Sequence, residues 1–241
     1  MRTRNRMYGA GSGIISQMGD NMKQKLQTYA VLWDMDGVLV DTGEFHFEAW
    51  KKAFEEVNVP FSKDSFRRTF GMNNAGILEW VYGRKPDPKE VSQMSDKKEA
   101  LFRKLIKGKV EPLPGVLKWL KQFQTWGIKQ AITSSAPPEN ISFLVAELQI
   151  EKYFEAIVSG FDLPGKPNPD VFLKAANIIH VHPDHCIIVE DAIAGVEGAK
   201  RAGMKCIAVT TTNAADKLTQ ANSIFENLER MSEEDFLQLL A

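Results

Sequence analysis

Residues 29–42 read YAVLWDMDGVLVDT and carry the strongest structural signal in the chain. The stretch opens as a short apolar run, which is typical of a buried parallel strand. Asp34 and Asp36 follow, and side chains two residues apart in a strand start on the same side. At Gly37 the chain must turn sharply out of the strand. Because open α/β sheets bind ligands at the carboxyl ends of their strands, the stretch predicts a functional site there.

A calcium-binding loop is the alternative interpretation of the Asp-x-Asp-Gly pattern. Such a loop needs a glutamate at its twelfth position and has no buried strand before it. Counted from Asp34, the twelfth position is Phe45, so the calcium pattern fails. Paired aspartates suit catalysis better, because one can attack an electrophile while its neighbour transfers a proton.

The composition is that of a globular protein without a strongly charged surface. The chain has 241 residues, of which 44% are hydrophobic and 25% charged, and its net charge is -1. We therefore expect no nucleic-acid or membrane partner, and no apolar run is long enough to span a bilayer. Cys186 and Cys206 each lie in a β-like apolar run, which favours buried free thiols in a reducing compartment. These features predict a cytoplasmic protein.

The order of periodic segments predicts an α/β fold with an insertion. From residue 43 to about 108 the spacing of apolar residues is helical throughout. Beyond that point strands and helices alternate, and the strands are expected at residues 128–133, 156–159, 186–189 and 206–209. Such alternation implies a parallel, doubly wound sheet. The helical block lies between the first strand and the second, so it is an inserted cap.

Three parts of the chain follow from this division. Residues 28–42 and 109–241 form the core domain, and residues 43–108 form the all-helical cap. Residues 1–27 are a basic, glycine-rich extension without apolar periodicity, and we expect them to be disordered. The extension lacks the apolar core of a secretory signal. A transit peptide and a native start at Met22 are alternative explanations for it.

Polar side chains are expected to gather at one edge of this sheet. Asp34 and Asp36 follow the first strand, Ser134 follows the second, and Glu190 with Asp191 ends the strand at 186–189. Lys166 precedes a helix after the strand at 156–159. Carboxylates crowded together repel one another unless a cation joins them, and their oxygens suit Mg²⁺. A lysine and a hydroxyl beside them can bind phosphoryl oxygens.

Four segments resemble the motifs of the haloacid dehalogenase-like (HAD) superfamily, in order and in spacing. They are residues 34–42, 132–135, 165–170 and 189–195. The resemblance runs from about residue 28 to 240 and is strongest to the β-phosphoglucomutase-like phosphatase and mutase branch. It implies a Rossmann-like HAD core with a helical cap inserted after the first motif.

The resemblance also implies catalytic roles. Asp34 would be the nucleophile that forms an aspartyl-phosphate, and Asp36 would be the acid/base. Ser134 and Lys166 would bind the transferring phosphoryl group, with Ser135 beside them. Dehalogenases of this superfamily lack the second aspartate, so Asp36 argues against dehalogenation.

The metal site is implied in the same way. Mg²⁺ would be held by the Asp34 carboxylate, the backbone carbonyl of Asp36 and Asp191, with Glu190 next to them. A second cluster consists of histidines, which are common ligands of transition metals, at His180, His182 and His185. It lies on the connection into the strand at 186–189, at the opposite sheet edge, so no metal role is expected for it.

Cap residues bear on the substrate. His46 and Lys98 match a cap histidine and a cap lysine of the mutase-like branch, and the turn at Gly71 resembles its substrate-specificity loop. β-Phosphoglucomutases carry an arginine in that loop that grips the second phosphate of the sugar, whereas this chain has Asn74. These residues are therefore predicted to bind substrate, and the missing arginine favours a phosphatase.

The sequence thus predicts a Mg²⁺-dependent phosphatase that acts on a small phosphorylated metabolite, such as a sugar phosphate. A phosphosugar mutase of the β-phosphoglucomutase type is the first alternative. A non-catalytic sensor of a phosphorylated ligand is the second, and the intact pair Asp34 and Asp36 argues against it. A monomer is expected, with an oligomer left open.

Overall fold

The computed structural model describes residues 19–69 and 72–240. A six-stranded sheet lies at its centre, in the order β3-β2-β1-β4-β5-β6, and every neighbouring pair is parallel. The strands are β1 (Ala30–Trp33), β2 (Lys129–Ser134), β3 (Ala156–Ser159), β4 (Cys186–Glu190), β5 (Lys205–Val209) and β6 (Ser223–Phe225). The parallel, doubly wound sheet is confirmed. The edge strand β6 was not expected from the sequence.

Strand β1 is central because it is apolar along its whole length. All of its residues are buried, and it pairs with β2 on one side and β4 on the other. Val31 and Trp33 face one hydrophobic layer, whereas Ala30 and Leu32 face the other. A strand that is covered on both faces needs a continuous apolar run, which the sequence provides.

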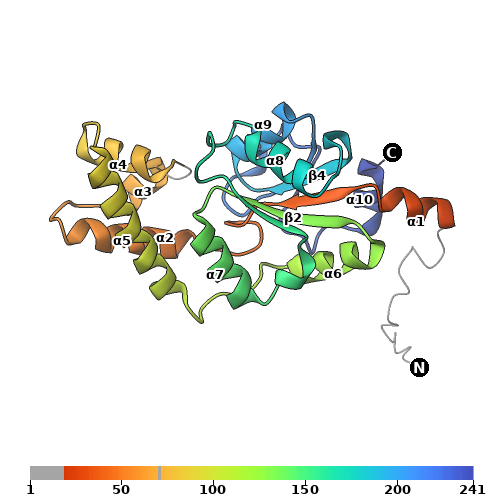
Figure 1. The fold of residues 1–241 in the computed structure, drawn as a ribbon, viewed down its shortest axis with the longest axis horizontal. Helices are drawn as coiled ribbons and strands as arrows, with labels where there is room; N and C mark the ends of the chain where they lie inside the picture. Colours follow the sequence, from red (N-terminus) through yellow and green to blue (C-terminus); the bar gives the residue numbers. More distant parts are fainter. Residues whose placement is uncertain (1–18, 70–71, 241) are drawn as a thin grey trace, which may run out of the picture.

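Helices cover both faces of the sheet, as Figure 1 shows. One layer contains α6 (Val116–Trp126), α7 (Pro138–Leu148) and α10 (Glu233–Leu239). The other contains α8 (Asp170–Ile178) and α9 (Ile193–Arg201). Short 3₁₀ turns complete the core at η2 (Glu151–Tyr153), η3 (Pro183–His185) and η4 (Ala215–Lys217).

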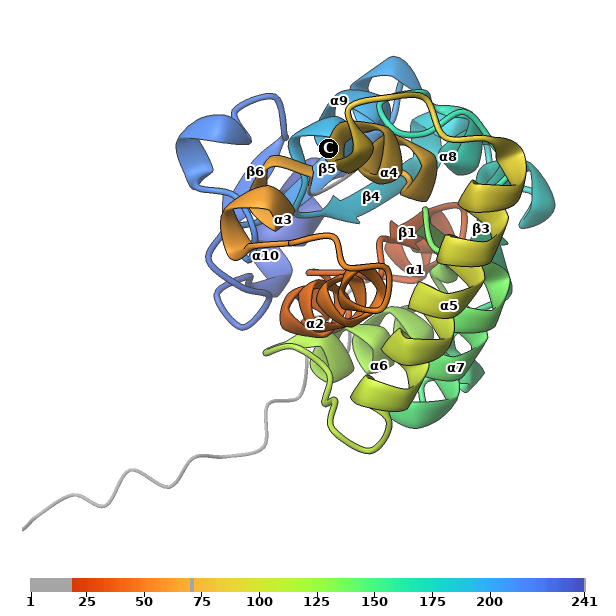
Figure 2. The ribbon, with the colours of Figure 1, turned by 90° about the vertical axis from the view of Figure 1, so that its left-hand side faces the viewer.

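The insertion after β1 is helical, as predicted. It contains α2 (Gly43–Glu55), α3 (Lys63–Thr69), α4 (Asn74–Tyr82) and α5 (Pro88–Ile106), and its described residues include no strand. These helices have their own hydrophobic cluster, in which Trp50 and Phe54 stack with ring centroids 5.2 Å apart. Figure 2, viewed from the cap side, shows them in front of the strands. The limits of the two domains stay a prediction.

The expected disorder of residues 1–27 is wrong for part of that range. Residues 20–26 form a helix, α1 (Asp20–Leu26). Leu26 is fully buried in the core, and the Lys25 ammonium donates to the backbone carbonyl of Leu240 at 2.9 Å. A single buried leucine produces no periodicity, so the pattern could not reveal this anchor. Residues 1–18 lie outside the described part of the chain.

No helix in the described part combines the length and the hydropathy needed to cross a bilayer.

Candidate active site

Buried polar side chains meet at the carboxyl ends of the central strands. Asp34 follows β1, Ser134 ends β2, and Glu190 ends β4, with Asp191 next in the chain. The backbone N–H of Asp34 donates to the carbonyl of Val189 at 3.0 Å, so the sheet ladder continues up to the carboxylates. All these polar side chains are buried. The strand ends thus hold a charged cluster against the hydrophobic core.

Lys166 bridges two of the carboxylates. Its Nζ lies 2.5 Å from Asp34 Oδ1 and 2.6 Å from Glu190 Oε1, and it also donates to the Thr133 carbonyl at 3.3 Å. Burial would lower the pKa of Lys166, but the adjacent charges of Asp34 and Glu190 outweigh it and raise that pKa. Lys166 is therefore a fixed cation beside Asp34 at neutral pH.

Asp34, Glu190 and Asp191 form the only group of at least three potential metal-binding side chains among the described residues. One ligand atom of each lies within 4.8 Å of the others. Burial, followed by the nearby carboxylates, raises the pKa of Asp34 well above its usual range, although Lys166 opposes this. Burial and the charge of Glu190 raise the pKa of Asp191 to about 7. One lysine does not balance these carboxylates, so the cluster fits a divalent cation.

Both carboxylate oxygens of Glu190 already accept hydrogen bonds from other groups of the protein. Its Oε1 binds Lys166, and its Oε2 accepts from the backbone N–H groups of Asp191 and Ala192 at 2.9 and 3.0 Å. A Cβ placed on Gly195 would lie 1.9 Å from Glu190 Oε1, so the helix can approach this carboxylate only with glycine there. Glu190 thus orients its neighbours, and Asp34 and Asp191 are better suited to contact a metal directly.

Asp191 is oriented by two residues that the sequence analysis missed. Thr212 Oγ1 donates to Asp191 Oδ2 at 2.6 Å, and Asn213 Nδ2 donates to the Asp191 carbonyl at 3.0 Å. Both lie in the loop after β5. A run of polar residues after a strand is the signal that identified the other groups, and it would have identified these. A Cβ on Gly37, whose φ is +84°, would lie 2.0 Å from Asp191 Oδ2.

Asp36 is held by one core residue and one cap residue. Thr42 Oγ1 donates to Asp36 Oδ1 at 2.6 Å, and His46 Nε2 lies 3.5 Å from the same oxygen. Burial alone would raise the pKa of Asp36, but the hydrogen bonds from His46 and from the Thr42 hydroxyl lower it below its usual value. Thr42 was not singled out from the sequence.

The cap contributes a second polar cluster. Lys98 Nζ lies 2.9 Å from His46 Nδ1 and is paired with Glu99 at 3.0 Å. The His46 ring stacks on Phe102 with centroids 4.1 Å apart. Burial and the charge of Lys98 lower the pKa of His46, which is therefore neutral at physiological pH. Asn74 Nδ2 donates to Glu99 Oε1 at 3.0 Å. Glu99 thus joins Lys98 to Asn74, and Lys98 continues the contacts to His46.

The remaining predicted residues differ in their surroundings. Ser134 is buried, and its hydroxyl accepts the Ala136 N–H at 3.1 Å. Ser135, the first residue after β2, is exposed. Gly71 lies outside the described residues. The catalytic and binding roles of all these residues stay predictions.

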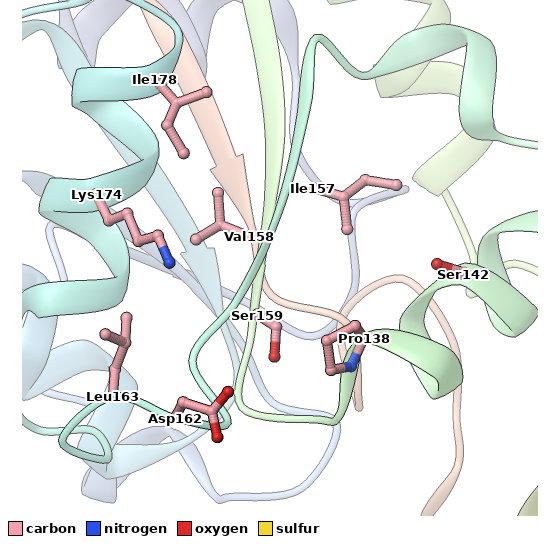
Figure 3. A pocket seen from close by; sticks show the side chains of 9 residues that line it. All are labelled: Pro138, Ser142, Ile157, Val158, Ser159, Asp162, Leu163, Lys174 and Ile178. Carbon is pink, nitrogen blue, oxygen red and sulfur yellow. The ribbon is translucent and has the colours of Figure 1, made fainter.

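Two other regions do not join this site. His182 pairs with Asp184 and His185 stacks on Tyr29, and the described residues place no metal-binding group at the three histidines. A cavity of about 340 Å³ lies beside the edge strand β3, where Figure 3 shows Asp162 and Lys174 among its lining residues. None of the predicted site residues lines it.

Comparison with known proteins agrees with this geometry. The family model described as haloacid dehalogenase-like hydrolase matches residues 31–209. A β-phosphoglucomutase from Bacillus subtilis is 36% identical over 189 residues, which are 75% of this chain and 82% of that protein. A phosphorylated carbohydrates phosphatase from Thermotoga maritima is 30% identical over 202 residues, which are 81% of this chain and 92% of that protein.

Solved structures show the same architecture. The crystal structure of a HAD hydrolase of family IA, variant 3, from Entamoeba histolytica matches with a TM-score of 0.81 and 26% identity. The match covers 88% of this chain and 99% of that one. The sequence motifs, the sheet topology, the helical insertion and these similarities agree. The chain is therefore an enzyme of the haloacid dehalogenase-like hydrolase family, in the branch that contains β-phosphoglucomutases and related phosphatases.

Proposed function

We propose that the protein is a Mg²⁺-dependent phosphatase that hydrolyses a small phosphomonoester through an aspartyl-phosphate on Asp34. The observation that carries the proposal is the position of Asp34 between Lys166 and the acidic pair Glu190 and Asp191. Asp36 is two residues away and is held by groups of both the core and the cap. A nucleophile, an acid/base and a fixed cation are thus present together.

In the first step, a carboxylate oxygen of Asp34 attacks phosphorus and the bond from phosphorus to the substrate oxygen breaks. Asp36 donates its proton to that departing oxygen, which leaves as an alcohol. The Lys166 ammonium and the Ser134 hydroxyl would bind the phosphoryl oxygens. Positioning and electrostatic stabilisation supply most of the rate enhancement in such a transfer.

In the second step, Asp36 accepts a proton from water as the water oxygen attacks phosphorus. The bond from phosphorus to Asp34 breaks, and inorganic phosphate and the free carboxylate are released. Asp36 is then protonated again and ready for the next substrate, so the two steps balance. Because the pKa of Asp36 is lowered in the free chain, substrate binding must raise that pKa or bring in the proton that Asp36 donates.

Asp34 and Asp191, with the backbone carbonyl of Asp36, are the groups that would hold Mg²⁺. The buried carboxylates support this assignment, because burial and the neighbouring carboxylates raise the pKa values of Asp34 and Asp191, and a cation would favour the ionised forms of both groups. When bound, Mg²⁺ supplies positive charge that offsets repulsion between the nucleophile and the phosphoryl oxygens. Glu190 would orient the groups around the metal without contacting it directly.

The proposed substrate class is a sugar phosphate or a molecule of similar size. The Thermotoga maritima relative is named as a phosphatase of phosphorylated carbohydrates. The similarity to a β-phosphoglucomutase favours a mutase as the second candidate. Asn74 argues against it, because its amide is bound to Glu99 and it carries no charge with which to hold a second phosphate. A small phosphorylated metabolite is thus the proposed partner, and the monomeric state and cytoplasmic location stay predictions.

Phosphate release from a panel of phosphomonoesters tests the proposal. We expect release that depends on Mg²⁺ and that is abolished in Asp34→Asn. The matched control is Asp184→Asn, the same change at an exposed aspartate outside the site. Conversion of a hexose 1-phosphate to its 6-phosphate without net phosphate release would support the mutase instead. No reaction in either assay would favour a non-catalytic sensor.

A further inference from the structure

A buried hydrogen-bond cluster joins the cap to the core away from the reacting carboxylates. Asn140 lies in the first turn of α7, in the core, and is 1% exposed. Its Nδ2 donates to Glu99 Oε2 at 2.6 Å, and its Oδ1 accepts from Arg103 Nη1 at 2.6 Å. Glu99 and Arg103 are four residues apart on α5, so they lie on one face of the cap helix. The two sides of a single amide therefore contact two opposite charges.

Glu99 is the centre of this cluster. Besides Asn140, it accepts hydrogen bonds from Lys98 and from Asn74. The side chains of Lys98 and Glu99 are only 4% and 9% exposed. Burial would raise the pKa of Glu99, but the charge of Lys98 and the Asn74 amide outweigh it and lower that pKa. A buried ion pair of this kind is held by its additional hydrogen bonds, so its position depends on them.

From Glu99 the contacts continue to Asp36. Lys98 has only donors, so the His46 Nδ1 that it contacts at 2.9 Å must be an acceptor. A neutral imidazole then carries its proton on Nε2, the atom that faces Asp36 at 3.5 Å. The orientation of the histidine proton towards Asp36 therefore depends on Lys98, and the position of Lys98 depends on Glu99.

We propose that Glu99, Arg103 and Asn140 form a cap–core latch, in which Glu99 is a positioning residue for the acid/base Asp36. When the latch is made, the cap carries Lys98 and His46 to Asp36, and when it breaks, these residues lose their fixed place. The proposal rests on the proposed phosphatase function, because it concerns the residue that protonates the leaving group there. Asn140 is suited to this position because one side of its amide donates and the other accepts.

The latch predicts an effect that depends on the leaving group. A p-nitrophenolate ion leaves without being protonated, whereas the alkoxide of an alkyl phosphate needs an acid. The ratio kcat/KM covers the steps up to departure of the leaving group. Damage to the positioning of Asp36 therefore lowers kcat/KM for an alkyl phosphate more than for p-nitrophenyl phosphate. Loss of a contact with only a structural role would lower kcat/KM equally for both substrates.

The test uses the full chain with Mg²⁺ and two substrates, p-nitrophenyl phosphate and the alkyl phosphate that the wild-type chain hydrolyses fastest. Asn140→Asp keeps the shape of the side chain and its pairing with Arg103, but it places a carboxylate against Glu99. We expect kcat/KM for the alkyl phosphate to fall at least about tenfold, and for p-nitrophenyl phosphate to stay within about twofold of wild type. Arg103→Met, which removes one contact of the latch, should give a smaller change of the same kind.

Glu147→Gln is the matched control. Glu147 also lies on α7 and accepts from the backbone N–H of Gly108 at 2.6 Å, but it does not contact Glu99. This variant should leave the ratio of the two kcat/KM values unchanged, and thermal unfolding shows whether each variant is folded. An equal loss for both substrates in Asn140→Asp and Arg103→Met would overturn the latch. A wild-type chain that hydrolyses neither substrate would contradict the phosphatase proposal itself.

Discussion

The Lys166 ammonium lies 2.5 Å from Oδ1 of Asp34. The side chains of Lys166 and Asp34 are only 9% and 11% exposed, and both residues lie in loops at the carboxyl edge of the sheet. Charge-assisted hydrogen bonds of this length are strong, and here the bond orients the proposed nucleophile. In the proposed mechanism, the same ammonium binds the phosphoryl group as it is transferred.

Replacement of Lys166 should damage activity and stability together. Lys166→Met leaves Asp34 and Glu190 buried without their shared cation, so unfolding in urea with EDTA should require about 3–5 kcal/mol less. The loss of one phosphoryl-binding donor should lower kcat by about 10²–10³. Lys174→Met, a change at an exposed lysine on α8, is the control and should affect neither measurement. Near-normal turnover in Lys166→Met would contradict the role assigned to the ammonium.

Gly195→Ala should be harmful although alanine favours helices. The added Cβ would lie 1.9 Å from Glu190 Oε1, so the carboxylate or the helix must move. Overpacking of this kind costs about 1–3 kcal/mol, and displacement of Glu190 should also weaken activity at limiting Mg²⁺. Chemical denaturation and a Mg²⁺ titration measure the two effects. Gly43→Ala, where the nearest atom is 3.6 Å away, should behave like wild type.

Thr212→Val should weaken metal binding without a large change in structure. The substitution removes the hydroxyl that donates to Asp191 Oδ2 at 2.6 Å, and such outer contacts of a metal ligand contribute about 10–100-fold to affinity. The measurement is the Mg²⁺ concentration that gives half-maximal phosphate release. Thr211→Val changes the neighbouring exposed residue and is the control. An unchanged Mg²⁺ requirement in Thr212→Val would argue against Asp191 as a ligand.

The acidity of Asp191 predicts how stability without metal depends on pH. Burial and the charge of Glu190 raise the pKa of Asp191 from 3.8 to about 7. The folded chain therefore keeps a proton that the unfolded chain releases, so this carboxyl stabilises the fold below about pH 4. That contribution is lost as the pH rises towards 7.

In EDTA, Tm should therefore fall more steeply between about pH 4 and 7 for wild type than for Asp191→Asn. Mg²⁺ should reduce the fall for wild type, because a cation favours the ionised carboxylate. Thermal unfolding followed by circular dichroism gives both slopes, with Asp184→Asn as a control that should parallel wild type. Identical slopes for wild type and Asp191→Asn would mean that Asp191 does not titrate in this range.

The sheet was predictable because its strands are buried on both faces and thus apolar throughout. The polar groups that follow β1, β2 and β4 were predictable for the same reason, since a parallel sheet brings strand ends together. Strand β6 was not, because Ser223–Phe225 is short and only half-buried. Helix α1 was missed because one leucine, Leu26, anchors it.

The contacts between the cap and the core could not be predicted from the chain. Glu99 and Asn140 are 41 residues apart, and each resembles an ordinary polar position of a helix. Their contact depends on how α5 packs against α7, which no local pattern encodes. Thr212 could have been predicted, because it is a polar residue just beyond the carboxyl end of β5, as Ser134 is a polar residue at the carboxyl end of β2. The candidate reacting groups were thus predictable from the sequence, whereas the hydrogen bonds between cap and core depend on tertiary packing.

The most direct measurement is of phosphoryl transfer to Asp34 in the variant Asp36→Asn. This variant keeps the nucleophile but lacks the group that activates water. With p-nitrophenyl phosphate and Mg²⁺ it should release about one p-nitrophenol per chain and then stop, and mass spectrometry should find one added phosphoryl group on Asp34. The double variant carrying Asp34→Asn should show neither. A wild-type chain that turns over while Asp36→Asn shows no burst and no phosphoryl group on Asp34 would contradict the proposed mechanism.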